Sequence, residues 1–128
     1  MSETTQRLGR AAEALVGDAL ERRGMLIVSR NERTSTVPGE IDLIALDGPV
    51  LVFVEVKALR VTSRGGPERP AMAVGWRKQR KLRSLALAWL RDRDGAVPRH
   101  AGLRFDVVGV RIDGAGRIAE WEHLRGAF

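Results

Sequence analysis

The stretch GEIDLIALDGPVLVFVEVKALR, residues 39–60, has the pattern of two apolar strands joined by a tight turn. Asp47-Gly48-Pro49 supplies the turn, between a predicted strand at Ile41–Leu46 and a second at Val50–Lys57. Charged residues nevertheless stand in and next to these strands, where core side chains are expected. These charged residues are Glu40, Asp42, Glu55 and Lys57.

The register of this hairpin decides where its charges meet, because side chains alternate between the two faces of a strand. A turn centred on Gly48-Pro49 pairs Ile44 with Phe53 and places Asp42 opposite Glu55. Opposed like charges destabilise a sheet, so these two acids need compensation. A divalent cation, Mg²⁺ or Mn²⁺, would provide it; protonation of one acid or a nearby arginine is the alternative.

Two further charged residues are candidates for the same site. Lys57 shares a face with Glu55 and, in this register, faces Glu40. It would orient a water and stabilise charge on a phosphate, or it would simply form an ion pair at the strand end. Glu13 lies at the edge of the apolar stripe of the first predicted helix, among small residues. It is a third candidate acid, with a solvent-exposed glutamate as the alternative.

Periodicity predicts the elements before this hairpin. Apolar residues recur every three or four positions from about Thr5 to Arg23, which predicts an amphipathic helix closed by Gly24. A short strand is expected at Met25–Ser29 and a polar loop at Arg30–Gly39.

After the hairpin, a flexible loop rich in Gly, Arg and Pro is expected at Arg60–Pro70. A second helix is predicted from about Ala71 to Arg93, followed by a strand at Leu103–Ile112 and a final edge strand at Arg117–Leu124. Helix, three strands, helix and one or two strands predict an α/β fold with a mixed sheet flanked by helices. The length of 128 residues suits one domain.

Positive charge is concentrated in parts of the chain. The net charge is +6, and WRKQRKLR, residues 76–83, contains five cations. Such density is typical of a nucleic-acid-binding surface, and equally of a solvated helix face with many arginines. Lys78 interrupts the apolar stripe and is expected to point toward the sheet, while its cationic neighbours face outward. The residues expected to hold a nucleic-acid backbone are Arg60, Arg64, Arg77, Lys78, Arg80, Lys81 and Arg83.

Composition excludes several classes of site. The chain has no cysteine, which excludes disulfides and thiolate metal sites and agrees with a cytoplasmic location. It has no apolar run long enough for a membrane span and no signal-peptide core at the N-terminus. The two histidines lack zinc-site spacing. Asp106 is expected to pair with an arginine or join a polar network, and the three tryptophans are expected in a core or an interface.

Several segments of the chain carry a resemblance to known proteins: LGRAAEALV (8–16), N-x-R (31–33), GEIDLIA (39–45), VFVEVK (52–57), AVGWRKQRKL (73–82), RFDVVGV (104–110) and the terminal GAF. Through them the chain resembles, over nearly its full length, the YraN family of small bacterial proteins. An acid followed by E-x-K on the next strand also resembles the PD-(D/E)xK nuclease superfamily, which includes restriction endonucleases and Holliday-junction resolvases.

This resemblance implies a restriction-endonuclease-like αβββαβ core and Mg²⁺- or Mn²⁺-dependent hydrolysis of DNA, including branched or structured DNA. It implies that Asp42 and Glu55 are metal ligands, Lys57 the catalytic lysine and Glu13 an auxiliary acid. A homodimer is expected if both strands are cut symmetrically. The proline that usually precedes the first acid is missing, since Glu40-Ile41 stands there. A nucleic-acid-binding module that keeps the fold without cleaving is the alternative.

Overall fold

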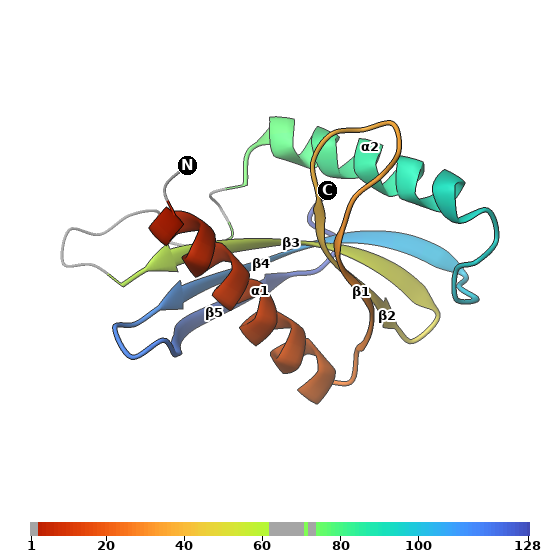
Figure 1. Cartoon of the computed structure of the whole chain (residues 1–128). Helices are drawn as coiled ribbons and strands as arrows, with labels where there is room; N and C mark the ends of the chain where they lie inside the picture. The colour runs from red at the N-terminus through yellow and green to blue at the C-terminus, as the bar shows by residue number, and fades with distance from the viewer. Residues whose placement is uncertain (1–2, 62–70, 72–73) are drawn as a thin grey trace.

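The computed structural model describes residues 3–61, 71 and 74–128. It contains two helices and five strands, in the order that the sequence predicts (Figure 1). In chain order these elements are α1 (Glu3–Arg22), β1 (Leu26–Glu32), β2 (Ile41–Asp47), β3 (Val50–Arg60), α2 (Trp76–Arg93), β4 (Gly102–Ile112) and β5 (Ile118–Leu124). The predicted α/β class is confirmed.

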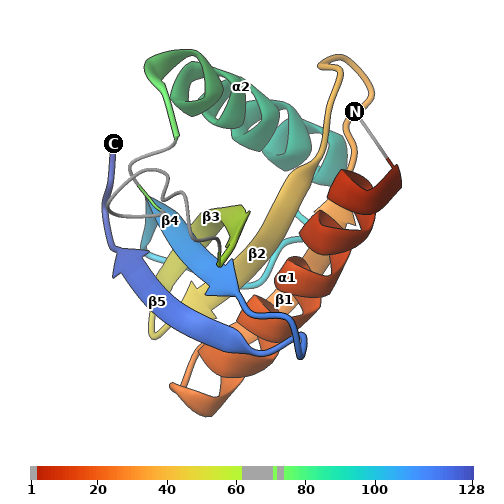
Figure 2. The same cartoon turned by 90° about the vertical axis from the view of Figure 1, so that its left-hand side faces the viewer.

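The five strands form one mixed sheet in the order β1-β2-β3-β4-β5. Neighbouring strands run antiparallel, except for β3 and β4, which are parallel and are connected through α2. A parallel neighbour requires a crossover, and α2 provides it. The two helices pack on the sheet from different sides (Figures 1 and 2).

Alternation along the strands divides the core into a layer for each helix. Leu43 and Ala45 of β2 are buried in the cluster with α1, whereas Ile44 is buried with α2. On the α2 side, Phe53 packs edge-on against Trp89, with ring centroids 5.9 Å apart. Burial on both faces explains why β2 and β3 are nearly continuous apolar runs.

The register predicted for the hairpin is confirmed along its ladder. Leu46 pairs with Leu51, Ile44 with Phe53, and the pair farthest from the turn is Leu43 with Val54. Gly48 takes a positive φ of 57° in the turn, a conformation that favours glycine. The next residues along both strands are Asp42 and Glu55.

The predicted boundaries of β1 and β3 are wrong by several residues. β1 continues through Arg30, Asn31 and Glu32, which the sequence analysis assigns to a loop. These polar residues occur in an edge strand because their side chains find partners on the two helices. β3 continues to Arg60, since its pairing with β4 outlasts its pairing with β2. The rest of the predicted 60–70 loop lies outside the described residues from position 62 on.

The predicted start of α2 is also wrong, because the helix begins at Trp76 and not at Ala71. Gly75 occupies the N-cap with an extended backbone, so Val74 is buried outside the helix. Trp89 is in the core as expected, but Trp76 is 60% exposed. None of the described helices has an apolar stretch sufficient to cross a membrane.

Candidate metal and nucleic-acid site

The two acids of the hairpin lie where β2 and β3 separate. Beyond the pair Leu43–Val54, the Oδ2 atom of Asp42 accepts a hydrogen bond of 2.9 Å from the backbone N–H of Val56. A side-chain oxygen thus takes the place of a backbone acceptor at the end of the ladder. The contact holds Asp42 beside Glu55, as the register predicts.

Proximity and burial change the ionisation of both acids. Burial, followed by the charge of Glu55, raises the pKa of Asp42 to about 8, although the Val56 N–H acts in the opposite direction. Burial also raises the pKa of Glu55, while Lys78 lowers it. Two carboxylates this close favour a shared proton unless a cation compensates them.

Lys78 reaches this pair from α2. Its Nζ atom lies 3.3 Å from Oε1 of Glu55, so the lysine points toward the acids as its place in the helix predicts. The side chain of Glu55 is 13% exposed and that of Lys78 62% exposed. The ammonium group is therefore free to exchange the carboxylate for another anion at low cost.

Lys57 is half-buried on β3 and lines the same cleft as the acids. The alternative in which Lys57 pairs with Glu40 is not what the structure shows. Oε1 of Glu40 instead lies 2.9 Å from Nη2 of Arg33. Lys57 is thus placed beside the acids, and the partner of Glu40 comes from the segment after β1.

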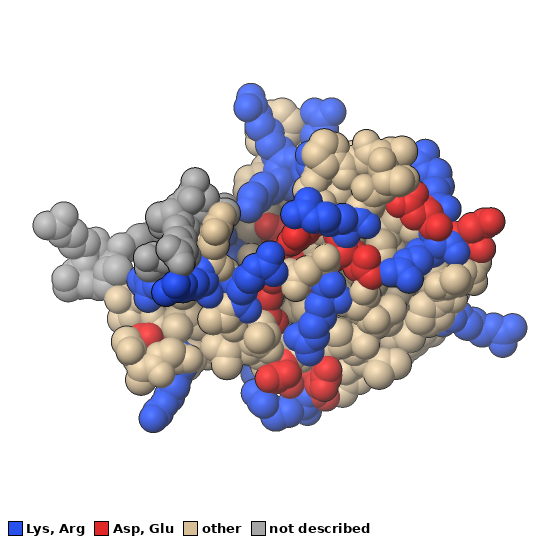
Figure 3. Space-filling view, in the orientation of Figure 1, with Lys and Arg blue, Asp and Glu red and all other residues tan. Residues whose placement is uncertain are grey.

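These residues line a cleft of about 570 Å³ between the two helices. Its acids are Glu13, Glu40, Asp42 and Glu55, and its cations are Arg10, Arg33, Lys57, Lys78 and Lys81. Figure 3 shows acidic side chains on this face with lysine and arginine side chains around them. This arrangement fits a polyanionic ligand, which binds to the surrounding cations and places one of its charged groups near the acids.

The structure divides the predicted nucleic-acid-binding residues into groups. Lys81 was expected to face outward, but it lines the cleft, because it lies one helical turn from Lys78 on the same side of α2. Arg77 and Arg80 lie over the ring of Trp76 on the exposed part of α2. Arg83 lies over Phe105 and Phe128. Arg60 ends β3 and is exposed, and Arg64 is outside the described residues.

Sequence reasoning missed three residues that the fold brings to the cleft or its acids. Arg10 and Arg33 line the cleft from α1 and from the segment after β1. Asn31 donates a hydrogen bond to Glu13, one of the cleft acids. The available signal was the N-x-R pattern at positions 31–33, which the family resemblance includes without assigning it a role.

The donor set fits a hard divalent cation with few protein ligands. Within residues 3–61, 71 and 74–128, no three His, Cys, Asp or Glu side chains form a group that could hold a metal by themselves. Asp42 and Glu55 supply two carboxylates, and Mg²⁺ commonly binds to one or two carboxylates and keeps several waters. Burial and the charge of Glu55 raise the pKa of Asp42, so a bound divalent cation would favour the ionised form of both acids.

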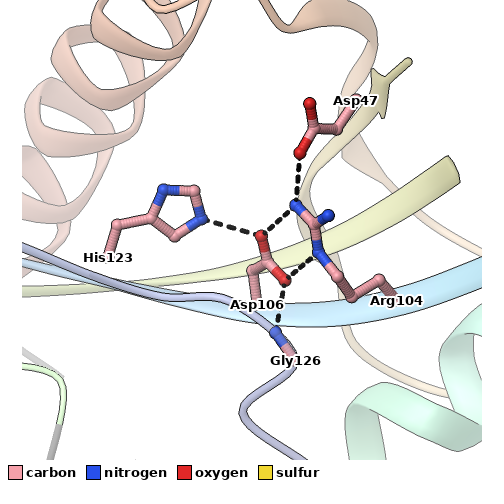
Figure 4. Close-up of polar contacts among 5 residues, drawn as sticks. All are labelled: Asp47, Arg104, Asp106, His123 and Gly126. Carbon is pink, nitrogen blue, oxygen red and sulfur yellow. Dashed lines mark hydrogen bonds and ion pairs between the residues drawn. The ribbon is translucent and has the colours of Figure 1, made fainter.

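A second polar cluster lies around the fully buried Asp106 (Figure 4). None of the residues of this cluster lines the cleft. Asp106 accepts hydrogen bonds from Arg104, from Gly126 N–H and from Nε2 of His123 at 2.7 Å. Arg104 also reaches Asp47, at the end of β2. The predicted pairing of Asp106 with an arginine is observed, and the cluster ties β2, β4 and the C-terminal residues together.

Comparison with known proteins places this chain in a family. The model of the uncharacterised protein family UPF0102 matches residues 12–110. The chain belongs to this family. Membership agrees with the YraN resemblance of the sequence, and the matched span includes Glu13, the acids of the hairpin and all of α2.

Individual members of the family are similar over almost their whole length. A UPF0102 protein of Arthrobacter sp. (strain FB24) is 47% identical over 119 residues, which are 93% of each chain. One of Rhodococcus jostii (strain RHA1) is 47% identical over 122 residues, covering 94% of this chain and 95% of the relative. One of Dictyoglomus thermophilum is 32% identical over 123 residues, covering 96% and 98%.

Proposed function

We propose that this member of UPF0102 is a divalent-cation-dependent nuclease that hydrolyses DNA phosphodiesters, with the fold of the PD-(D/E)xK superfamily. The observation that carries the proposal is the pair of adjoining acids, Asp42 and Glu55, with Lys57 beside them in a cation-lined cleft. The helix and strand order supports the superfamily placement. A binding surface alone gains nothing from opposed buried carboxylates, since they cost stability.

Asp42 and Glu55 are the residues that would hold Mg²⁺ or Mn²⁺. When bound, such a cation lowers the pKa of water and stabilises negative charge on phosphate oxygens. Lys57 contributes a fixed ammonium group next to the acids, which orients the attacking water and binds a phosphate oxygen. Lys78 neutralises Glu55 in the absence of substrate and turns to the phosphate when DNA enters.

The cleft cations would hold the DNA backbone on either side of the reacting phosphate. Arg10 and Arg33 stand on the side of α1 and β1, and Lys81 stands on α2. These contacts go to phosphates and fix position without reading bases. We therefore expect the cleft to select DNA by the shape of its backbone. Such selection suits branched or structured DNA better than a specific base sequence.

The test is Mn²⁺ calorimetry combined with cleavage assays on duplex, single-stranded and four-way-junction DNA. The variant Asp42→Asn/Glu55→Gln replaces both acids with amides of similar size, and it is expected to be at least as stable as wild type because it removes the cost of placing two acids together in a buried site. The matched control is Glu120→Gln, which removes an acid from β5 that is not part of the cleft lining.

Metal binding and cleavage by wild type and by the control, with both lost in the double variant, would support the proposal. Metal binding without cleavage of any substrate would point instead to a DNA-binding module that does not hydrolyse. Absence of Mn²⁺ binding at millimolar concentration would overturn the metal site.

A further inference from the structure

Asn31 has an unusual backbone conformation for a residue inside a strand. Its φ is +51°, in the left-handed region, although it lies within β1. Among the described non-glycine residues, positive φ occurs also at Asp94, which caps the C-terminus of α2, where this conformation is common. Asn31 caps no helix. Asn adopts this conformation more readily than most residues, and non-glycine residues of this kind cluster at functional sites, where surrounding contacts maintain them.

The left-handed residue changes which way the side chains of β1 point. In a regular strand, Arg30 and Glu32 would share one face and Asn31 would point to the other. Instead, Arg30 and Asn31 both reach α1, whereas Glu32 forms an ion pair with α2. The partner of Asn31 on α1 is Glu13. The backbone therefore turns the Asn31 amide toward the helix that carries the third acid.

Contacts on both sides hold this conformation. The guanidinium group of Arg30 lies against Gly17 of α1, where a Cβ atom would not fit, and it is 3.4 Å from Glu21. On the other side, Glu32 contacts Ser29 and Arg93. Neither neighbour can turn without losing an ion pair.

The Asn31 amide contacts Glu13, which lies in the same cleft as Asp42 and Glu55. Nδ2 of Asn31 donates a hydrogen bond to Oε2 of Glu13, because an amide nitrogen donates and a carboxyl oxygen accepts. Glu13 lines the cleft together with Asp42 and Glu55. Asn31 itself lies opposite Asp42, between the paired residues Arg30 and Glu32 of β1.

We propose that Asn31 is a positioning residue whose amide holds the Glu13 carboxylate toward Asp42 and Glu55, where it accepts a hydrogen bond from the attacking water. This inference rests on the proposed nuclease function. It assigns Asn31, which is not part of the cleft lining, an effect that acts through Glu13. Loss of such an outer partner typically lowers metal affinity or activity by about 10- to 100-fold.

Two substitutions distinguish the contribution of the Asn31 side-chain amide from that of the backbone conformation. Asn31→Gly removes the amide and accepts positive φ freely, whereas Asn31→Ala removes the amide and strains the backbone. Asn31→Gly is expected to lower kcat by about 10- to 100-fold with KM unchanged and the thermal midpoint not reduced. Asn31→Ala should show the same loss of kcat together with a lower midpoint. A purely structural role would give loss of kcat only in Asn31→Ala, and that result would overturn the inference.

A double-mutant cycle tests whether the effect passes through Glu13. Glu13→Ala is expected to lower kcat, and adding Asn31→Gly to it should lower kcat no further. If the two effects multiply, Asn31 acts by another route and the inference is wrong.

Side-chain amide NMR without metal or DNA separates this inference from the nuclease proposal. The Asn31 NH₂ resonances, assigned by their absence in Asn31→Gly, are expected to exchange slowly with solvent and to lose that protection in Glu13→Ala. If wild type neither binds Mn²⁺ nor cleaves DNA, the nuclease proposal fails by itself. If the amide exchanges equally fast in wild type and Glu13→Ala, the positioning of Glu13 by Asn31 is overturned, whatever the activity.

Discussion

At the scale of single residues, the groups around Asp42 determine its ionisation. Burial and the charge of Glu55 raise its pKa to about 8, so without a cation the carboxyl is protonated at neutral pH. A divalent cation must displace this proton to bind both acids. Metal affinity and pH are therefore linked at this site.

Mn²⁺ affinity is accordingly expected to rise about tenfold per pH unit up to about pH 8 and to level off above it, because the proton is absent there. Calorimetry between about pH 6 and pH 9, in two buffers with different ionisation enthalpies, measures both the affinity and the protons released. About one proton should leave at pH 7. Affinity that does not vary below pH 8 would contradict the raised pKa of Asp42.

Lys57 and Lys78 both stand near the acids, but their surroundings predict different effects. Lys57→Met is expected to lower kcat by about 100- to 1,000-fold with Mn²⁺ affinity retained, because a half-buried donor next to the reacting phosphate is removed. Lys78→Met is expected mainly to raise KM, since this exposed lysine exchanges partners. Steady-state kinetics of the two variants measure the difference, and equal losses of kcat would contradict it.

At the scale of elements, the buried cluster around Asp106 joins β4 to β2, which is not its neighbour in the sheet, and to Gly126 near the C-terminus. Burial by itself raises the pKa of Asp106. Hydrogen bonds from His123, Arg104 and Gly126 N–H lower the pKa by more than burial raises it, to about 2. This acid therefore stabilises the fold in its ionised form.

Because the pKa of Asp106 is lower in the folded protein than in the unfolded chain, its contribution is complete above about pH 4 and is lost as the pH falls toward 2. Asp106→Asn leaves Arg104 without its buried partner and is expected to cost about 3 kcal/mol of unfolding free energy at pH 7. Urea unfolding of both proteins at several pH values measures this difference. It should shrink as the pH falls below about 4, and a constant difference would mean that ionisation of Asp106 contributes nothing.

At the scale of the whole molecule, the two helices and the ends of β2 and β3 form one cationic cleft. DNA affinity is expected to fall with salt, because cations that contact phosphates release counterions on binding. Arg33→Ala and Lys81→Ala should each reduce the slope of log K against log salt by about 1. Arg91→Ala, in the last turn of α2 and outside the cleft lining, is the matched control and should leave the slope unchanged. Equal slopes for all variants, measured by fluorescence anisotropy, would exclude the cleft as the binding surface.

The sequence by itself determined the elements and the meeting of Asp42 and Glu55. The apolar runs and the turn at Asp47-Gly48-Pro49 leave one register that buries both faces of the hairpin, and that register is the one observed. Local patterns were sufficient there, because hairpin pairing depends on residues close in sequence. The predicted start of α2 is wrong because the apolar pattern continues through Val74, which is buried outside the helix.

Only the tertiary structure decided what surrounds those acids. Polar residues at the end of β1 look like a loop in the sequence, since their partners Glu13, Glu21 and Arg93 lie on helices distant along the chain. Likewise, no local pattern shows that Arg33 pairs with Glu40 or that Lys81 lines the cleft. Periodicity reports which side of an element is apolar, but the direction of a polar side chain depends on the charge that packing brings opposite it.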